Sequence, residues 1–357
     1  MCILEIKMKG LKYLAALSIP LATAAAIYVK GMSAYTALIY AFVFIPLVEI
    51  LLKQNPKNDT KESALKMKAA KLYDWLLYIN LPVVWGLLIW CLYTIRLGGL
   101  EHYEIIGLAL SLGVCLGTNG INVAHELGHR KDNRETLVAK ALLLPSWYMH
   151  FYIEHNWGHH TYAATKEDPA TAAYNQSVFS FWYSSVTRQY INAWRIQKKL
   201  NVTKGVMWYS VKNDMLWYLL IQLGYLVAVY VVFGYETACF AVAAGSVGFL
   251  LLETVNYIEH YDLLREKNAA GRYEVVRAKH SWNSNHVVGR IVLYELTRHS
   301  DHHYKAAKKY QTLECLEDAP QMPFGYPTSM VISMVPPLWF ALMNKRIPKD
   351  MTALYKV

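Results

Sequence analysis

The sequence predicts an all-α integral membrane protein, with six transmembrane helices and a histidine-rich, metal-binding cytoplasmic cap. Two observations carry this prediction. The chain of 357 residues is 55% hydrophobic, and its apolar residues gather in six long runs. Nine of its thirteen histidines fall in four short clusters, each at or just beyond the end of a hydrophobic stretch. Nothing indicates a second independently folding unit, so we expect residues 1–357 to form a single domain.

The six apolar runs have the length of membrane-spanning helices. Each holds about 17–22 residues, close to the ~20 residues that cross the core of a bilayer as a helix. Runs of this length, six times over, are rarely the core helices of a soluble protein. The first run lacks the short apolar region and small-residue cleavage site of a secretory signal, so we expect it to remain as a span. The predicted spans are 13–29, 35–52, 75–95, 103–124, 214–233 and 238–258.

The positions of the charges predict the orientation of the spans. The formal net charge is +10, and 34 of the 36 Lys and Arg residues lie in segments that six spans place on one side. Only Lys30 and Arg96 lie in the short loops on the other side. Because basic residues concentrate on the cytoplasmic side, we expect both termini and the segments 125–213 and 259–357 in the cytoplasm, below an inner (plasma) membrane. This asymmetry is a topology signal and does not indicate nucleic-acid binding.

The cysteines exclude a thiolate metal site. None of the five forms a CxxC pair, and three of them lie within predicted spans. A disulfide framework or a cysteine-based zinc or iron site is therefore not available. If the reaction needs electrons, another protein must deliver them. The cysteines are Cys2, Cys91, Cys115, Cys239 and Cys315.

A few polar or broken segments complete the predicted organisation. The stretch 265–290 is polar and punctuated by glycine, which is typical of a loop or hairpin. Residues 330–343 are apolar but carry Pro336 and Pro337, so we expect this segment at the interface or packed on the cap. Glu49 and Asp74 are expected to be polar groups at helix ends. Glu253 lies within the sixth span, where an ionisable group is a functional candidate by default.

The histidine clusters predict a site for two metal ions. Imidazole suits iron, copper, zinc and nickel. Two histidines at i and i+4 lie on one face of a helix, close enough to share a metal. Nine ligands exceed what one ion can hold, but they suit two ions with open positions for a small molecule. The candidate ligands are His125, His129, His155, His159, His160, His260, His299, His302 and His303.

Two other functions compete with this reading. Taken alone, the run from His125 to His129 also matches the HExxH motif of zinc proteases, in which Glu126 would be the general base. Such a protease needs only one further ligand, which leaves most of the clustered histidines without a purpose. A metal transporter is the other alternative, but its ligands should line the middle of the membrane rather than gather at the ends of helices.

Acidic residues beside the clusters are candidates to orient the ligands. A histidine that binds a metal usually donates its other N–H group to a carboxylate or carbonyl, which fixes the tautomer. Glu126, Glu154, Glu259 and Asp301 each flank a clustered histidine. We expect a structural or surface role for the remaining histidines, which are His102, His150, His280 and His286.

Together the motifs resemble the membrane-bound alkane 1-monooxygenases (alkane ω-hydroxylases), of the histidine-rich, non-haem di-iron fatty acid desaturase/hydroxylase superfamily. The resemblance covers residues 75–340. In desaturases the second histidine motif is usually HxxHH, whereas here it is HxxxHH, which favours the hydroxylase branch. The matching motifs are HELGHR (125–130), EHNWGHH (154–160) leading into EDPA (167–170), NYIEHY (256–261), SWNSN (281–285) and RHSDHH (298–303).

The resemblance implies a reaction and its partners. The nine histidines would bind two iron ions, and a rubredoxin-type protein with its reductase would supply electrons. With O2, the enzyme would hydroxylate the terminal methyl of medium or long linear alkyl chains. An apolar tunnel between the helices would admit the chain, and large side chains in the spans would limit its length. Our candidates for that role are Phe42, Phe44, Trp85 and Trp90.

The alternative within the same superfamily is a desaturase or hydroxylase of fatty acyl or other lipids. Three departures from the family pattern bear on this choice. Relatives usually have glycine after the NYIEHY motif, whereas this chain has Asp262, a carboxylate within reach of the site. The segments 173–176 and 53–56 also differ from the family pattern. These differences concern the identity of the substrate more than metal binding.

Overall fold

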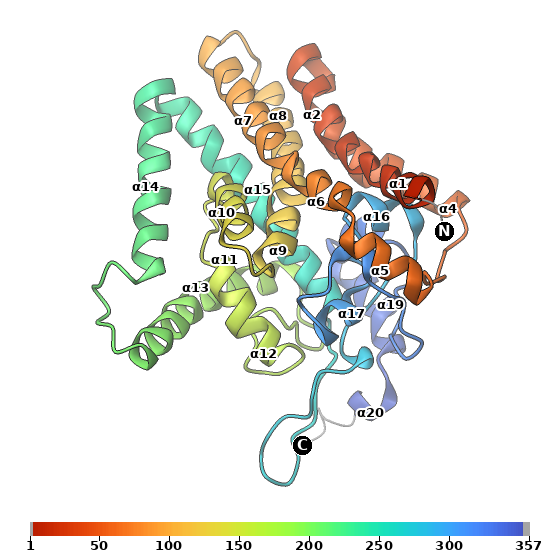
Figure 1. The fold of residues 1–357 in the computed structure, drawn as a ribbon. Coiled ribbons are helices and arrows are strands. Elements are labelled where there is room, and N and C mark those ends of the chain that lie inside the picture. The colour runs from red at the N-terminus through yellow and green to blue at the C-terminus, as the bar shows by residue number, and fades with distance from the viewer. Residues whose placement is uncertain (1–2, 353–357) are drawn as a thin grey trace.

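The structure, a computed structural model, describes residues 3–352 as helices joined by loops (Figure 1). No strand occurs in this range, and two isolated β-bridges are the only extended pairings in it. Six of its segments are long and apolar enough to cross a membrane, which confirms the predicted number of spans. Cys2 lies outside the described residues.

The first two spans are built from several short helical elements. The first covers Met8–Val29, and the second, after a turn at Lys30 (φ 60°), covers Gly31–Leu51. Residues 12–17 and 31–35 form 3₁₀ turns, and residues 40–44 form a π turn. The elements are α1 (Ile3–Leu11), η1 (Lys12–Leu17), α2 (Ser18–Val29), η2 (Gly31–Tyr35), α3 (Thr36–Ile39), η3 (Tyr40–Phe44) and α4 (Ile45–Leu51).

The third and fourth spans form a helical hairpin. They cover Lys71–Leu97 and His102–Gly128, and each extends a few residues beyond its predicted ends. The fourth span begins with a capping box, in which the side chains of Glu101 and Glu104 bind the free N–H groups of the first turn. The elements are α6 (Lys71–Tyr78), α7 (Asn80–Leu97), α8 (His102–Cys115), η4 (Leu116–Ile121) and α9 (Asn122–Gly128).

The last two spans are α14 (Asp214–Phe233) and α15 (Tyr235–Glu259), joined by Gly234 at φ 87°. They meet at this turn and diverge toward the other end, so α14 stands apart at the edge of the bundle (Figure 1). Only 11% of the apolar window of α14 is buried, against 72% for the fourth span. The fourth span is therefore central, and α14 exposes most of its surface to the surrounding lipid.

The remaining helices lie at the end of the bundle where α9 and α15 end (Figure 1). Helix α5 follows the second span, and the others come from the two segments predicted to form the cap, 125–213 and 259–357. The first group is α5 (Lys61–Ala69), α10 (Asn133–Leu143), η5 (Leu144–Ser146), α11 (Phe151–Ile153), η6 (Glu154–His159), α12 (His160–Tyr162) and α13 (Val178–Thr203). The second is η7 (Ala278–His280), α16 (Val287–Val292), α17 (His299–Tyr304), η8 (Tyr310–Thr312), α18 (Tyr326–Ser333), α19 (Pro336–Met343), η9 (Asn344–Arg346) and α20 (Lys349–Thr352).

A second apolar core holds the C-terminal helices onto the end of α15. Trp339 and Met343 of α19 are fully buried and pack with Tyr257 and Tyr261. The segment 330–343, predicted at the interface or on the cap, is thus packed on the cap. An antiparallel bridge between residues 267 and 273 agrees with the loop or hairpin predicted there.

Three acidic residues of the spans tie elements together. Glu49 is buried and accepts a hydrogen bond from the Gly289 N–H at 2.7 Å. Asp74 pairs with Arg130 at 3.2 Å and with Lys309 at 2.7 Å, which anchors α6 to the cap. These two are the helix-end polar groups that the sequence predicts. Glu253, by contrast, lies outside the metal-binding groups of histidines described below, in a buried hydrogen-bond network of its own.

Candidate metal centre

The nine clustered histidines converge from four separate parts of the chain. They fall into two adjacent groups, and within each group the ligand nitrogens lie within 4.8 Å of one another. In every close contact between these rings, the atom that faces its neighbours is Nε2. The five-histidine group is His125, His129, His155, His160 and His302, and the four-histidine group is His159, His260, His299 and His303.

The spacing of the nitrogens fits metal coordination. Neighbouring Nε2 atoms are 2.9–3.2 Å apart in both groups. Two nitrogens bound to one ion at about 2.1 Å and at a right angle are about 3 Å apart. Hydrogen bonds do not explain the arrangement, because each Nε2 converges with several others on one point. Within the described residues, both groups consist of imidazoles alone and include no carboxylate or thiolate.

Helix geometry sorts the histidines between the groups. His125 and His129 stand four residues apart at the end of α9 and belong to the same group. The turn from residue 154 to 159 is a π-helix, which closes hydrogen bonds between residues i and i+5. His155 and His160, five residues apart, therefore share a group, and His159 joins the other one.

The C-terminal half of the chain completes both groups. His260 directly follows the last residue of α15 and is fully buried. In α17, His299 and His303 stand four residues apart and join the four-histidine group. His302, on another face of the same helix, joins the five-histidine group. This short helix therefore contributes to both groups and fixes their distance from each other.

Burial keeps most of these imidazoles neutral. It lowers the pKa of His129 to about 4 and that of His260 to about 3. Burial, reinforced by the neighbouring imidazoles, also lowers the pKa of five further ligands outside the spans, which are named at the end of this paragraph. A neutral imidazole offers a free lone pair at Nε2, which is the form that binds metals. The further ligands are His155, His160, His299, His302 and His303.

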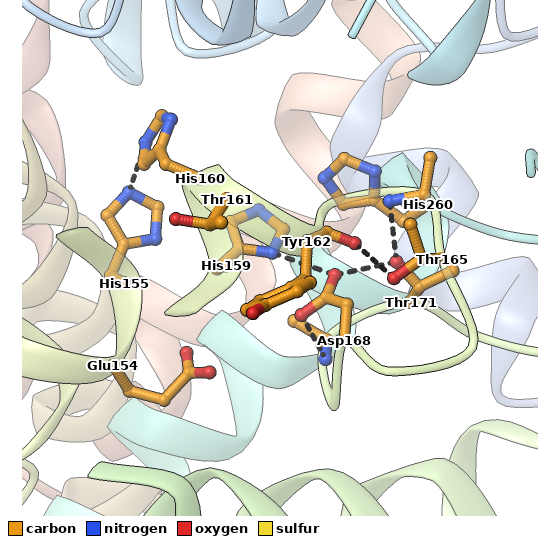
Figure 2. A network of polar contacts seen from close by, with 12 residues as sticks. Glu154, His155, His159, His160, Thr161, Tyr162, Thr165, Asp168, Thr171 and His260 are labelled. Carbon is orange, nitrogen blue, oxygen red and sulfur yellow. Dashed lines mark hydrogen bonds and ion pairs between the residues drawn. The ribbon is translucent and has the colours of Figure 1, made fainter. Parts of the chain in front are cut away.

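Asp168 orients one ligand and is missing from the sequence prediction. Its Oδ2 accepts a hydrogen bond from Nδ1 of His159 at 3.0 Å, as Figure 2 shows. Thr171 Oγ1 donates to the same oxygen at 2.6 Å, and the Ala170 N–H donates to Oδ1 at 3.1 Å. Burial opposes charge on either partner, yet their attraction raises the pKa of His159 and lowers that of Asp168. The sequence signal that could have identified Asp168 was the DPA motif (168–170), which follows the second histidine cluster.

Of the acidic residues predicted to orient ligands, Glu259 lies closest to one. Its Oε1 is 3.3 Å from Nδ1 of His299. Glu126 instead accepts hydrogen bonds from Arg130 at 2.7 Å and from the Tyr310 N–H at 3.2 Å. Glu126 therefore ties the metal-binding end of the fourth span to the C-terminal part of the cap.

The other two flanking carboxyls support the local fold. Glu154 accepts a hydrogen bond from Asn192 of α13 at 3.1 Å, and burial, with the charge of Asp168, raises its pKa to about 8. Asp301 accepts from Lys308 at 2.7 Å and from the Glu314 N–H at 2.7 Å. Asp301 thus closes the loop that follows α17.

The backbone explains why glycine suits the position of Asp262. This residue has φ 58°, in the left-handed region where glycine is favoured and Asp is tolerated. Its N–H donates to the Ala172 carbonyl at 2.9 Å, and its side chain is fully buried. Residues 260–262 thus form a turn directly after α15.

A narrow apolar cavity reaches both groups of histidines. Its free volume is about 70 Å³, and it lies between the first, second, fourth and sixth spans. His125 and His155 of one group and His299 of the other are among its lining residues, as is Glu259. Most of its walls are aliphatic or aromatic side chains, including Ile19, Ala41, Phe42, Ile45, Phe151, Leu251, Leu252, Val255, Val292, Leu293, Leu296 and Met330.

Of the four aromatic residues expected to line a tunnel, only Phe42 lines this cavity. Phe44 is 53% exposed and Trp90 is 39% exposed, so both face the lipid. Trp85 donates from its indole to the Ala141 carbonyl at 3.1 Å and packs on Tyr225. For these three residues the expectation is corrected: the second span turns Phe42 inward, and its neighbour two positions later points outward.

The four histidines outside the groups differ in their surroundings. His102 is exposed at the start of α8. His280 is fully buried, and its Nδ1 accepts a hydrogen bond from the Arg277 N–H at 3.0 Å. His286 contacts Ser284 at 2.9 Å. His150 is buried beside Tyr148, away from both groups.

Fold and site together define a class: an all-helical protein with six apolar spans and a nine-imidazole site able to hold two metal ions. The family model of the fatty acid desaturases matches residues 102–330. Alkane 1-monooxygenase 2 of Alcanivorax borkumensis is 34% identical over 96% of this chain and 92% of its own length. Alkane 1-monooxygenase 1 of Pseudomonas aeruginosa is 36% identical, with 88% of this chain and 83% of that protein covered. The chain therefore belongs to the fatty acid desaturase family and, within it, to the alkane 1-monooxygenases.

Proposed function

We propose that this protein hydroxylates the terminal methyl group of medium and long linear alkanes, with O2 as the oxidant. The observation that carries the proposal is the apolar cavity whose lining includes His125, His155 and His299. These residues belong to both groups of histidines, so a chain end in the cavity faces both. The curated relatives of this chain, named alkane 1-monooxygenases, support this choice of substrate.

We propose iron as the metal in both groups. All-imidazole sites suit several first-row metals, including iron, zinc and copper. Zinc, however, is almost always four-coordinate in structural sites, and catalytic zinc sites typically use three protein ligands. Five imidazoles in one group exceed both patterns, but they leave one position of an octahedron open. When bound, the two irons would supply the redox chemistry that activates O2.

The surrounding residues would position the substrate and exclude water. The cavity walls are mostly apolar, and besides the histidines their polar side chains are Thr118, Asn122, Asn256 and Glu259. A narrow cavity admits a chain end more easily than a branched or ring carbon, which favours attack at the terminal methyl. Asp168 would hold the ring of His159 in a fixed orientation through its hydrogen bond to Nδ1.

We propose that an external protein of the rubredoxin type delivers the electrons, with its reductase. Among the described cysteines, Cys91 and Cys115 are buried in the spans, and none belongs to a metal group. The described part of the chain thus offers no cysteine-based redox centre. The elements α9, α12 and α17, which carry histidines of both groups, lie toward one end of the bundle, where a soluble partner could approach.

We propose an inner-membrane location with both termini and the metal centre on the cytoplasmic side. Supporting this, 34 of 36 basic residues flank the spans on the side that carries the histidines. Reporter fusions after residues 32, 99 and 235 should report the opposite side of the membrane from a fusion at the C-terminus. Proteolytic cleavage of the 160s loop from outside the cell would contradict this arrangement.

The product distribution tests the function. Membranes with this protein, rubredoxin and its reductase would be supplied in turn with alkanes, fatty acids and acyl esters. We expect 1-alkanols from linear alkanes, identified by gas chromatography with mass spectrometry, and iron bound to the purified chain. Conversion of acyl lipids only, or the appearance of a double bond, would instead support the desaturase alternative. Zinc as the only bound metal would contradict the proposal.

A further inference from the structure

Helix α13 buries a largely polar face against the rest of the protein. Four of its seven buried side chains are polar, namely those of Ser185, Gln189, Gln197 and Asn201. Ser185 and Gln189 donate hydrogen bonds to the Glu253 carboxylate of α15 at 2.6 and 2.8 Å. A surface helix of a soluble protein turns its apolar stripe toward the core and its polar face toward water. The inward face of α13 does not follow that pattern.

The outward side of α13 carries large apolar and aromatic side chains. Tyr183 is 78% exposed, and Val202 is 68% exposed. Phe179 and Ile191 are exposed as well. A contiguous apolar surface of this kind is unfavourable in water and marks a site of contact with a protein or a membrane.

The loop from residue 204 to 213 continues this surface to the start of α14. More than half of the surface of four large side chains is exposed there, namely those of Met207, Trp208, Tyr209 and Val211. The loop is held in place by Asn213, which donates from its amide to the Trp208 carbonyl at 2.5 Å and caps α14. Trp and Tyr are enriched where membrane helices leave the bilayer core. The residues just before α14 occupy such a position.

The charge of this surface has a single sign. Residues 171–213 contain six basic side chains and no acidic one. All six are exposed. Long basic side chains beside an apolar surface can extend their charged ends into the lipid head-group layer, where anionic lipids attract them. The six residues are Arg188, Arg195, Lys198, Lys199, Lys204 and Lys212.

The fold places this surface at the boundary of the membrane-spanning bundle. Because α14 and α15 turn back on each other at Gly234, the start of α14 and the end of α15 lie at the same end of the bundle. Figure 1 shows α13 at that end, running across the direction of α14. Since α14 exposes most of its own surface to lipid, the apolar side of α13 and its loop adjoin a surface already in contact with lipid.

We propose that α13 and the loop 204–213 lie in the head-group layer of the bilayer and bind anionic phospholipids. The exposed apolar and aromatic side chains enter the acyl region, and the basic side chains contact the phosphates. A second copy of this chain explains the surface less well, because two faces with the same positive charge repel each other. An anionic lipid surface complements both the apolar character and the charge.

This contact would also set the position of the metal centre relative to the membrane. Asn192 of α13 donates to Glu154 at 3.1 Å, and Glu154 directly precedes the ligand His155. Hydrogen bonds to Glu253 join the same helix to α15, which ends beside His260. Lipid bound along α13 therefore braces the elements that carry ligands of both groups.

Lipid photolabelling of the intact, iron-loaded protein in phosphatidylcholine nanodiscs tests the proposal. Two probes, a phosphatidylglycerol and a phosphatidylcholine, carry the same diazirine in the acyl chain close to the head group. Each is added at the same mole fraction, and labelled peptides are identified by mass spectrometry. We expect both probes to label residues 178–213. The phosphatidylglycerol probe should label 195–213 about fivefold more strongly or better, since one lysine near an anionic surface contributes about that factor.

Two triple variants with the same change of charge locate the preference. Labelling by the two probes should become nearly equal in the variant Lys198→Gln, Lys204→Gln and Lys212→Gln. The control removes three exposed basic side chains from the loop after α15, at the far end of the cap, and should keep the preference (Figure 1). It combines Lys267→Gln, Arg272→Gln and Arg277→Gln. Labelling of α14 by both probes shows that the bundle is intact in each variant.

Three results would overturn the proposal. Equal labelling of 195–213 by the two probes in the native protein would remove the preference for anionic lipid. No labelling of this segment by either probe would show that protein rather than lipid covers the surface. Loss of the preference in the control variant would assign it to the net charge of the protein instead of to this surface. Because the assay needs no turnover, its result is independent of the product assay.

Discussion

Asp168 and His159 form the closest contact between a carboxylate and a ligand imidazole in the metal centre, with 3.0 Å between Oδ2 and Nδ1. Among the described residues, a second contact of this kind joins Oε1 of Glu259 and Nδ1 of His299, which lie 3.3 Å apart. Both of these histidines belong to the four-histidine group. A carboxylate at Nδ1 raises the basicity of the imidazole. We therefore expect the group with fewer ligands to contain the more strongly donating one, His159.

Replacing Asp168 with asparagine should weaken the four-histidine group. The amide can still accept a hydrogen bond from His159, but it lacks the negative charge that strengthens the ligand. Changes of this kind typically lower metal affinity or activity by about 10–100-fold. We expect a loss in that range, measured as iron retained after dialysis and as alkane turnover.

The neighbouring acidic residue provides the control for this substitution. Glu167 is partly exposed and pairs with Lys267 at 3.2 Å, away from the ligands. Glu167→Gln should retain nearly full iron content and turnover. Equal losses in the two variants would show that Asp168 acts through the loop rather than through His159.

Single ligand substitutions should affect the two groups unequally. His260→Ala leaves three imidazoles in its group, whereas His129→Ala leaves four in the other. We therefore expect His260→Ala to release more iron on dialysis, although both variants should lose turnover. His102→Ala, at an exposed position outside both groups, should change neither quantity. Full turnover of His260→Ala would show that this residue is not a ligand.

The six spans and the converging histidines could be read from the sequence because each signal is local. Twenty apolar residues in a row define a span, and imidazoles spaced at helical intervals define a shared face. The predicted ends of the spans differ from the structure by a few residues. At the fourth span, the helix continues past 124 to Gly128 and carries His125 with it.

The assignment of histidines to groups depends on features that a sequence does not display. In an ordinary α-helix His155 would share a face with His159, but the π turn pairs it with His160 instead. Asp168 reaches His159 only because the loop after α12 folds back on the cluster. Whether an aromatic residue such as Phe42 or Phe44 faces the cavity depends on the rotation of its helix, which uniformly apolar sequences leave undetermined.

Phe42 should limit the length of the accepted chain. Its ring lines the cavity between the second span and the histidines, so Phe42→Ala should lengthen the space available. We expect the preference for alkanes to shift toward longer chains, measured by competition among substrates of different length. Val255→Phe, at a position of α15 that also lines the cavity, should shift it toward shorter chains. Phe44→Ala, at a lipid-facing position, is the control and should leave the preference unchanged.

Close contact between α8 and α15 should depend on Gly113. A Cβ at this position would collide with the side chain of Val247 and lie 3.0 Å from the Ala244 carbonyl oxygen. Small residues allow such close approach of membrane helices. Gly113→Ala should therefore destabilise the protein by about 1–3 kcal/mol, the usual cost of overpacking. A lower melting temperature of the detergent-solubilised protein would reveal this loss.

Gly86 of α7 makes the matched comparison, because a Cβ there meets nothing within 4 Å. In a helix, alanine is favoured over glycine by up to about 1 kcal/mol, so Gly86→Ala should keep or raise the melting temperature. The two substitutions add the same methyl group, and they differ only in what surrounds it. If both substitutions lowered the melting temperature equally, the destabilisation would come from replacing a glycine in a helix rather than from a collision at the α8–α15 contact. If neither did, α8 and α15 would have room to separate, and the ligands at the ends of α9 and α15 would be held by the cap alone.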